Sequence, residues 1–291
     1  ICAPHYHACA MDGIALLASL TYGATGTTPV YLRNDQFIHV DTGDPLPQGC
    51  DAVVMIEDVI EVKTGVRLNE AAVPWQHIRQ IGEDICAGEM ILPSFTDITP
   101  SAMGAMLAGG VLNLDVLKKP LVGIIPTGDE IVPPTNSPKE GDIIEFNSTI
   151  FSAMLEEWGA VSRTYPIAKD DLPGIISTLS QAVAECDVVL LCAGSSAGRE
   201  DFSARAIQEV GIVLHHGIAI KPGKPAILGH AGAKAILGVP GYPISGIIVL
   251  ENILRPVINR LLARDDEPRS VVKAELSRAV NSPLKYEEFI R

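Results

Sequence analysis

The sequence predicts a multidomain protein of α/β and β structure, in which a β-rich region precedes a larger α/β domain. Two patterns carry this prediction. Short β-prone runs separated by turn residues fill residues 24–115, and strand-like and helix-like segments alternate from residue 119 onward. With 291 residues, 47% of them hydrophobic and 20% charged, the chain can form more than one hydrophobic core.

In the β-rich region, Gly, Pro, Asn and Asp separate β-prone runs, which lie at residues 30–32, 37–40, 52–56, 59–62 and 66–68. Residues 101–110 are predicted to form a short helix, because Pro100 can start it and two glycines can end it. This spacing indicates a small all-β module followed by one helix.

From residue 119 onward, apolar runs predict strands at 121–125, 187–192, 213–220 and 235–238. Helical periodicity predicts helices at 148–158, 172–185, 201–210 and 244–262. The alternation favours a parallel sheet covered by helices on both faces, which is a three-layer α/β/α domain. Alternating residues at 271–276 predict a further strand after this domain.

These elements divide the chain into four predicted parts. Residues 1–23 and 82–118 form a partial first domain and linker, 24–81 the β-rich second domain, 119–265 the α/β/α domain, and 266–291 the start of an incomplete C-terminal β domain. The chain opens on Ile1 and ends in a strand-like run, so we expect it to be a piece of a longer protein.

The formal net charge is −13 and the isoelectric point is about 4.9. This charge disfavours attraction to nucleic acid or to an anionic membrane, so an anionic ligand must be held by a local group of cations. No apolar run reaches the roughly 18 residues that a membrane-spanning helix needs, and no signal peptide stands at the start. We therefore expect a cytoplasmic protein without nucleic-acid or membrane partners.

The six cysteines include no C-x-x-C pair, which indicates reduced thiols rather than a disulfide framework. Cys2, His5, His7 and Cys9 supply four possible metal ligands close together. Zinc sites usually draw their ligands from two separated pairs, so the alternative is an extended, partly exposed segment.

Four loops after predicted strands carry residues suited to a phosphate and metal site, namely 126–130, 193–201, 220–225 and 239–245. In a parallel sheet, such loops meet at one edge. Glu130 and Asp201 could hold Mg²⁺ there, although Asp201 could equally cap its helix. Lys221 and Lys224 flank Pro222 and Gly223, a rigid turn that could aim both ammonium groups at one anion. Two solvated lysines are the alternative.

Residues 194–198 also fit the G-x-S-x-G pattern of a hydrolase nucleophile, with Ser196 as the attacking residue. The histidines that follow it are His215, His216 and His230, and the first two fall in the next predicted strand, close to the loop in sequence. A glycine-containing turn before a helix instead favours phosphate binding. We predict that Ser196 is not a nucleophile and that its loop holds phosphate. Walker and Rossmann phosphate-binding patterns are absent from the sequence.

Seven short motifs, in order along the chain, resemble those of the MoeA-type molybdenum insertases. These are the molybdopterin molybdenumtransferases that share their fold with the E domain of gephyrin. The motifs are Ala10-Met-Asp-Gly13, the T-G-x-x-L-P-x-G-x-D-A-V-V run of 42–54 followed by Glu57, Ile81-Gly-Glu-Asp-Ile85 with Gly88, Thr127-Gly-Asp-Glu130, Asn147-Ser148, Lys221-Pro-Gly-Lys-Pro225 and Pro240-Gly-Tyr-Pro243.

The resemblance implies a molybdopterin-binding, MogA-like α/β/α domain and an elongated homodimer, with the active site between the α/β domain of one subunit and the first two domains of the other. The implied reaction inserts molybdenum from molybdate into adenylylated molybdopterin, with Mg²⁺ and release of AMP. Partners would include the enzyme that makes the adenylylated substrate and molybdoenzymes that accept the product.

The resemblance also implies the site residues. Catalytic roles fall to Asp12, Thr42, Asp84, Glu130, Asp171 and Asp201. Cofactor-binding roles fall to Gly128, Gly194, Ser195, Ser196, Gly198, Lys221, Gly223, Lys224, Pro240, Gly241 and Ser245. Within these sets, Lys221, Lys224 and Ser245 correspond to the group that binds molybdate, and Glu130 and Asp201 to the nucleotide and Mg²⁺ side.

Two loops depart from the family pattern: G-G-V-S-V-G stands here as Ala193-Gly-Ser-Ser-Ala-Gly198, and P-G-N-P as Pro240-Gly-Tyr-Pro243. These changes are similar to those of a branch fused to a periplasmic-binding-protein-like domain. One alternative function is a non-catalytic scaffold or cofactor-binding protein, which would have lost the charged site residues. Another is a molybdopterin adenylyltransferase, which would lack the β-rich region.

Overall fold

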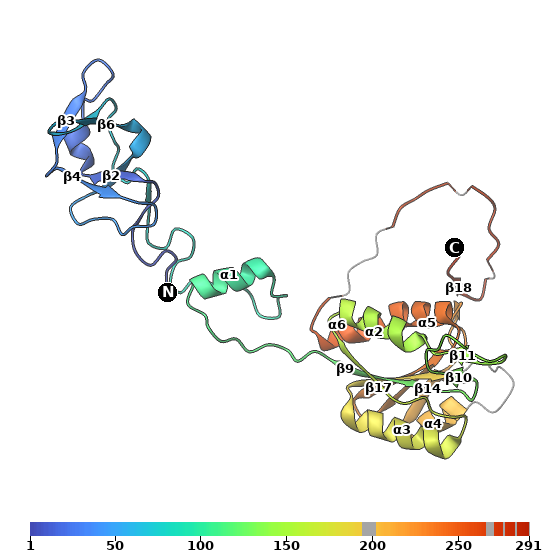
Figure 1. The fold of residues 1–291 in the computed structure, drawn as a ribbon. Coiled ribbons are helices and arrows are strands. Elements are labelled where there is room, and N and C mark those ends of the chain that lie inside the picture. The colour runs from blue at the N-terminus through green and yellow to red at the C-terminus, as the bar shows by residue number, and fades with distance from the viewer. Residues whose placement is uncertain (194–201, 266–270, 276, 283, 291) are drawn as a thin grey trace. The chain divides into compact units, whose positions relative to one another are not determined.

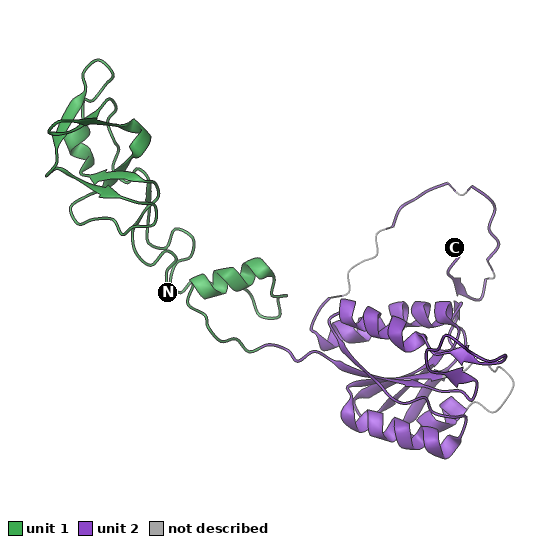
Figure 2. Ribbon diagram, viewed as in Figure 1, with its two compact units in different colours: residues 1–115 green, residues 116–291 purple. Residues whose placement is uncertain are grey.

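The computed structural model describes residues 1–193, 202–265, 271–275, 277–282 and 284–290. The chain forms two compact units, residues 1–115 and residues 116–291 (Figure 2). Buried hydrophobic residues form separate clusters within each unit, so each unit has its own core.

Unit 1 contains two three-stranded antiparallel sheets. In the first, β2 (Gly13–Leu16) lies between β4 (Phe37–Val40) and β5 (Ala52–Met55). In the second, β7 (Gly65–Leu68) lies between β3 (Val30–Arg33) and β6 (Val59–Val62). A short pair joins β1 (Ala8–Cys9) to β8 (Ile78–Arg79), and two 3₁₀ turns, η1 (Ala18–Thr21) and η2 (Ile56–Asp58), follow β2 and β5. All five predicted β-prone runs are strands.

Helix α1 (Pro100–Ala108) confirms the predicted helix and begins one residue earlier. Thr99 caps it, because its Oγ1 accepts the N–H of Ala102 at 3.2 Å. Strand β2 was not predicted. All four of its residues are buried, so it lacks the polar alternation by which a half-exposed strand is found.

Unit 2 contains a six-stranded sheet with the order β12-β9-β13-β17-β16-β14. The strands are β9 (Leu121–Pro126), β12 (Val161–Thr164), β13 (Val188–Ala193), β14 (Ile212–His216), β16 (Ile227–Ala231) and β17 (Lys234–Pro240). The first four in spatial order are parallel, whereas β16 is antiparallel to both of its neighbours. The sheet is therefore mixed: four strands are parallel as predicted, and β16 departs from that prediction. Only Gly232 and Ala233 separate β16 from β17, and a connection this short requires an antiparallel pair.

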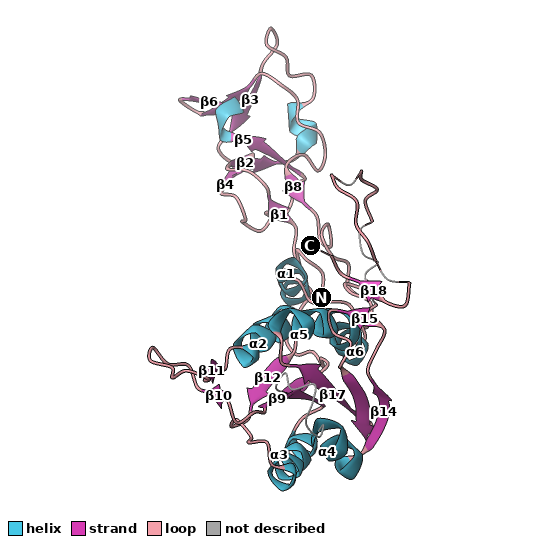
Figure 3. Ribbon diagram, turned by 90° about the vertical axis from the view of Figure 1, so that its right-hand side faces the viewer, coloured by secondary structure: helices cyan, strands magenta, loops and turns pink. Residues whose placement is uncertain are grey.

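Helices cover both faces of this sheet, as predicted (Figures 1 and 3). One face carries α3 (Leu172–Glu185) and α4 (Phe202–Val210); the other carries α2 (Asn147–Glu157), α5 (Pro243–Val249), the π-helical turn η3 (Leu250–Leu254) and α6 (Arg255–Leu261). Successive residues of the central strands face opposite cores: Ile124 and Leu190 contact one helical layer, and Ile125 and Leu191 the other. The α/β/α fold class is confirmed.

Further details differ from the prediction. The strand expected over 213–220 ends at His216, and a separate strand β15 (Ile220–Lys221) pairs with β18 (Glu287–Glu288). A second short pair joins β10 (Ile131–Val132) to β11 (Ile143–Ile144). Residues 271–275 are not a strand: Val271 and Val272 are 88% and 83% exposed, and no described strand pairs with them. Across the described ranges, every helix is too short or too polar to span a bilayer.

Candidate functional site

The carboxyl ends of β9, β12, β13 and β17 lie at one edge of the sheet of unit 2. Strand β14 runs in the same direction as β17, because both are antiparallel to β16, so the chain leaves β14 at this edge too. Most predicted site residues of unit 2 follow these strand ends. The loop after β13 carries Gly194, Ser195, Ser196, Gly198 and Asp201, and those five residues lie outside the described ranges.

The turn after β9 is fixed by its backbone. Thr127 donates to Cys192 O both from its N–H, at 2.9 Å, and from Oγ1, at 3.0 Å. Gly128 has a φ of +144°, and a Cβ at this position would lie 2.7 Å from Ile131 Cγ1 and 3.2 Å from Glu130 Oε2. Because a side chain at this position would be strained and would crowd Ile131 and Glu130, Gly128 lets Glu130 fold back over the turn.

Three carboxylates gather near this turn: Asp129, Glu130 and Asp170. The N–H of Asp170 donates to Asp129 Oδ1 at 3.3 Å. Burial raises the pKa of Asp170, and the charges of Glu130 and Asp129 raise it further. Carboxylates that repel one another in this way suit a hard divalent cation such as Mg²⁺. Within the described ranges no three acidic, histidine or cysteine side chains enclose a metal ion by themselves, and the predicted ligand Asp201 lies outside those ranges.

The predicted catalytic residue Asp171 lies beside this group but is the N-cap of α3. Its Oδ2 accepts the N–H of Gly174 at 2.9 Å, and its carboxylate therefore stabilises the helix. The neighbouring Asp170 is the carboxylate that contacts the acidic turn, and the sequence analysis did not select it. The predicted start of the helix at Leu172 could have distinguished the two, because the residue just before a helix is its cap.

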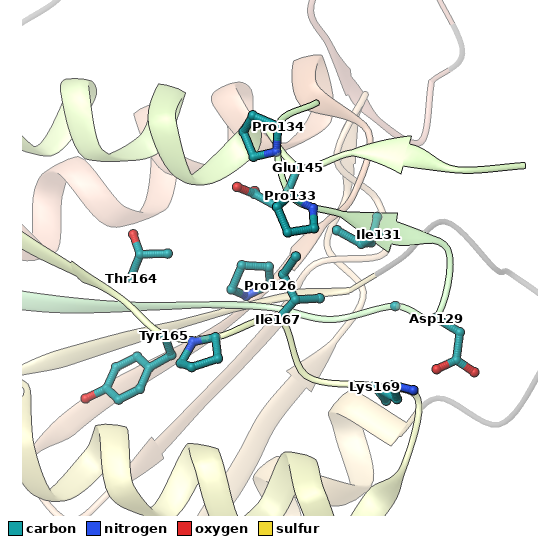
Figure 4. A pocket seen from close by; sticks show the side chains of 12 residues that line it. Pro126, Asp129, Ile131, Pro133, Pro134, Glu145, Thr164, Tyr165, Ile167 and Lys169 are labelled. Carbon is teal, nitrogen blue, oxygen red and sulfur yellow. The ribbon is translucent and has the colours of Figure 1, made fainter. Parts of the chain in front are cut away.

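A pocket of about 490 Å³ opens between the ends of β9 and β12 and the β10–β11 pair. Figure 4 shows Pro126, Pro133, Ile131 and Ile167 gathered at its middle. Its polar lining residues include Asp129, Lys169, Glu145 and Thr164. The Tyr165 hydroxyl donates to Glu185 Oε2 at 2.7 Å, outside the pocket. The pocket is therefore mainly apolar, with charged groups along its lining.

Asn147 fixes the loop that follows β17. Its Nδ2 donates to Gly241 O at 2.9 Å, while its Oδ1 is buried without a hydrogen-bond partner in the described structure. Pro240 ends the strand, and Ser245 is buried in the first turn of α5. The predicted residues Pro240, Gly241 and Ser245 therefore lie at the same sheet edge. Asn147 was recognised only as part of a family motif, and its buried amide oxygen marks it as a further site residue. Tyr242, where this loop departs from the family pattern, is 67% exposed.

The two predicted anion-binding lysines lie in and after β15. Lys221 Nζ is 3.0 Å from Glu288 Oε1, and Lys224 Nζ is 5.7 Å from the centre of the Tyr286 ring. Between them Gly223 has a φ of +123°, and a Cβ there would lie 3.0 Å from Ile220 and Val249 side-chain atoms. Both lysines are exposed to solvent, as the alternative of two solvated lysines expects, and each also contacts one residue of the segment 286–288. The sequence analysis did not select Glu288 or Tyr286 as their partners.

Unit 1 contains the other predicted carboxylates. Asp12 Oδ1 accepts from Thr42 twice, from the N–H at 2.6 Å and from Oγ1 at 2.7 Å. These hydrogen bonds lower the pKa of Asp12, so its carboxylate is ionised at neutral pH. Asp84 instead forms an ion pair with Arg79 of β8, the strand that pairs with β1. The structure thus brings Asp12 and Thr42 into contact, and it gives Asp84 a different partner.

The His and Cys residues near Ile1 do not converge on one point. Cys9 is buried in β1, Cys2 Sγ accepts the N–H of Ala87 at 3.4 Å, and His7 Nδ1 accepts the N–H of Ile81 at 3.2 Å. These contacts fit the alternative interpretation of an extended, partly exposed segment.

The fold and the site together define a class of protein with a molybdopterin-binding α/β domain. Residues 1–110 match the family model described as "MoeA N-terminal region (domain I and II)", and residues 123–260 match the model described as "Probable molybdopterin binding domain". The two matched regions lie within unit 1 and unit 2 respectively.

Individual relatives support the same family assignment. The chain is 30% identical to molybdopterin molybdenumtransferase 2 of Mycobacterium tuberculosis, over 99% of this chain and 76% of the relative. It is 29% identical to a molybdopterin molybdenumtransferase of Haemophilus influenzae, over 89% of this chain and 67% of the relative. A crystal structure of the molybdopterin biosynthesis MoeA protein of Pyrococcus horikoshii superposes with a TM-score of 0.76 at 30% identity, over 90% of this chain and 70% of that one. The chain belongs to the MoeA-type molybdopterin molybdenumtransferase family, as the motifs predicted.

Proposed function

We propose that this protein inserts molybdenum from molybdate into adenylylated molybdopterin and releases AMP, in the cytoplasm. Membership of the family makes it an enzyme of molybdenum cofactor biosynthesis. The observation that supports the specific reaction is the pair of opposite charges at one sheet edge, with carboxylates after β9 and lysines after β14. A substrate that carries metal-bound phosphate at one end and receives an oxyanion at the other needs both the carboxylates and the lysines.

On the acidic side, Glu130 would hold Mg²⁺ together with Asp201, and Asp129 and Asp170 would add negative charge around the ion. When bound, Mg²⁺ neutralises the phosphates between AMP and molybdopterin. The Gly128 turn brings the Glu130 carboxylate over the backbone at the strand end. The chain's own contribution on this side is to position that carboxylate.

On the basic side, the ammonium groups of Lys221 and Lys224 would bind molybdate, with the Ser245 hydroxyl as a further donor. Each ammonium carries three N–H donors, so Lys221 can hold an oxyanion while it also contacts Glu288. Main-chain groups at Pro240 and Gly241 would approach the substrate between the two charged sides, in a loop fixed by Asn147.

Unit 1 would complete the site of a second subunit in a homodimer. Thr42 keeps Asp12 ionised, so Asp12 can accept a hydrogen bond or contact a metal ion, but it is poorly suited to donate a proton. Asp84, paired with Arg79, would add a second carboxylate. We assign Asp12 and Asp84 to the active site between two subunits because the family resemblance implies it.

The reaction can be tested with the purified chain, adenylylated molybdopterin, molybdate and Mg²⁺, by measuring AMP release. We expect Glu130→Gln and Lys221→Ala to lower the rate by about 100-fold or more, because each removes a charge that stabilises the transition state. Glu140→Gln and Lys139→Ala are matched controls on the exposed loop between β10 and β11 and should keep the wild-type rate. Wild-type rates in both site variants would contradict the proposal. A folded chain that binds the substrate but releases no AMP would favour the scaffold alternative.

The shared site can be tested by mixing subunits. A homodimer of Asp12→Asn chains and one of Lys221→Ala chains should each be inactive. A heterodimer of the two variants would contain one intact site, so co-expression should restore part of the activity. No recovery from a mixture shown to form heterodimers would contradict the placement of units from two subunits in one site.

A further inference from the structure

The segment of residues 284–290 lies against the lysine turn. Strand β18 pairs with β15 in parallel: the N–H of Glu287 donates to Ala219 O at 2.9 Å, and the N–H of Phe289 donates to Lys221 O at 2.8 Å. These two bonds fix the register in which Glu288 lies opposite Lys221. The contact between the two side chains therefore follows from the backbone pairing.

Glu288 is well suited to bind a cation. Its side chain is only 14% exposed, whereas that of Lys221 is 56% exposed, so the carboxylate is held in the protein and the ammonium reaches the solvent. The hydrogen bond from Lys221 lowers the pKa of Glu288, and Glu288 is therefore ionised at neutral pH. Tyr286, two residues earlier, presents its ring to Lys224.

The lysine turn therefore has a counter-anion of its own. Lys221 and Lys224 contribute two positive charges and Glu288 one negative charge, so the local net charge is one positive charge rather than two. An oxyanion that approaches Lys221 meets a carboxylate already in contact with the same ammonium group. The repulsion between that carboxylate and the oxyanion opposes binding.

We propose that Glu288 is a positioning residue of the anion site, which holds the Lys221 ammonium in place and sets how tightly the site binds an oxyanion. The inference rests on the proposed role of Lys221. Glu288 weakens binding by its charge, and this keeps the subsite from retaining abundant anions before the substrate arrives.

The charge of the ligand gives a specific test. Coulomb repulsion is proportional to the ligand's charge, so loss of the Glu288 charge must affect a dianion twice as strongly, in free energy, as a monoanion of the same shape. Molybdate and perrhenate are tetrahedral oxyanions of similar size with charges of two and one. For Glu288→Gln we expect molybdate to bind about tenfold tighter and perrhenate about threefold tighter, the square root of the first factor.

The experiment is calorimetric titration of the full chain with sodium molybdate and with sodium perrhenate. The variants are Glu288→Gln, the matched control Glu287→Gln on the same strand, and Lys221→Ala. Glu287 is exposed, so its substitution should leave both affinities close to wild type. The expected result is a gain in Glu288→Gln alone, larger for molybdate than for perrhenate.

Each of the other outcomes contradicts either the role of Glu288 or the proposed molybdate site. Unchanged or weaker binding in Glu288→Gln overturns the inference, and so does an equal gain for both anions, which would indicate a rearranged strand β18 rather than a charge effect. No binding by either the wild type or Glu288→Gln also overturns it. If Lys221→Ala binds molybdate as well as the wild type, the proposed molybdate site itself is wrong. If Lys221→Ala loses binding and Glu288→Gln behaves as the wild type, only the role of Glu288 is wrong.

Discussion

The two charged ends of the sheet edge in unit 2 differ in how their charges are compensated. At the acidic end, Asp129, Glu130 and Asp170 form no ion pair in the described structure, and burial, followed by the charges of Glu130 and Asp129, raises the pKa of Asp170. At the basic end, Lys221 is paired with Glu288 and Lys224 lies near the Tyr286 ring. The acidic end thus needs a cation from outside, whereas the basic end is already partly neutralised from within.

This difference fits the two kinds of ligand in the proposed reaction. A magnesium-bound phosphate brings its own cation to the acidic end, where it removes the repulsion between carboxylates. A free oxyanion brings no cation, and it must share Lys221 with Glu288. Strands β13 and β17 lie between β9 and β14 in the sheet, so a ligand that joins both ends must cross the loops that follow these two strands.

The largest effect on the acidic end is expected from Gly128→Ala. The new Cβ would lie 2.7 Å from Ile131 Cγ1, in a backbone conformation with a φ of +144°. We expect a loss of about 2–3 kcal/mol in the free energy of unfolding of unit 2, measured by urea denaturation. The turn would also open, so the Mg²⁺ dependence of AMP release should weaken.

Gly141→Ala is the control for Gly128→Ala. Gly141 also has a positive φ, of +94°, but nothing lies within 4 Å of the position of its Cβ. This substitution should cost only about 1 kcal/mol from backbone strain. Equal losses in the two variants would show that the contact with Ile131 does not hold the acidic turn.

A smaller effect is expected from Asn147→Asp, which tests the loop between the two ends. The substitution replaces the amide that donates to Gly241 O at 2.9 Å by a carboxylate oxygen that cannot donate. We expect a loss of about 1–3 kcal/mol in stability, since a partly buried carbonyl loses its donor. Asn136→Asp, on the exposed loop between β10 and β11, should be close to neutral. If Asn147→Asp has wild-type stability and substrate affinity, the amide does not position this loop.

The sequence predicted the helices and central strands of unit 2 because their apolar residues are contiguous or periodic. The predicted helix at 172–185 coincides with α3, and the buried run at 187–192 is β13. Strand β12 was missed because it lies at the edge of the sheet, where Ser162 and Arg163 can face solvent. Strand β16 was missed because Gly229 and His230 interrupt its apolar pattern.

The sequence predicted site residues only where the residues that carry the chemistry are close together in the chain. The turn after β9 and the lysine turn were found from their glycines and charged residues. Glu288 was missed because a contact between Lys221 and a carboxylate 67 positions later depends on the pairing of β15 with β18. Asp170 was missed because its neighbour Asp171, the N-cap of α3, was chosen instead. No local pattern encodes the pairing of β15 with β18, although the strand-like run at the end of the chain contains β18.

The smallest effects should appear in the dependence of stability on pH, and here Asp170 and Asp12 should behave in opposite ways. The pKa of Asp170 is raised in the folded protein from its ordinary 3.8, so the folded state binds this proton more tightly than the unfolded state. The contribution of Asp170 to stability is fully present below pH 3.8 and is lost as the pH rises through the raised pKa. Asp170→Asn should therefore increase Tm slightly at neutral pH, and Mg²⁺ should remove the difference if it binds beside Asp170.

For Asp12, the hydrogen bonds from Thr42 lower the pKa, so its contribution to stability is present above 3.8 and is lost as the pH falls through the lowered value. Asp12→Asn keeps an oxygen that can accept from Thr42 but loses the charge, so Tm should fall slightly at neutral pH and match the wild type in acid. Thermal unfolding of the wild type and both variants from acid to neutral pH measures these differences. If both variants shift Tm in the same direction at neutral pH, the two carboxylates are not in the contrasting environments that the structure gives them.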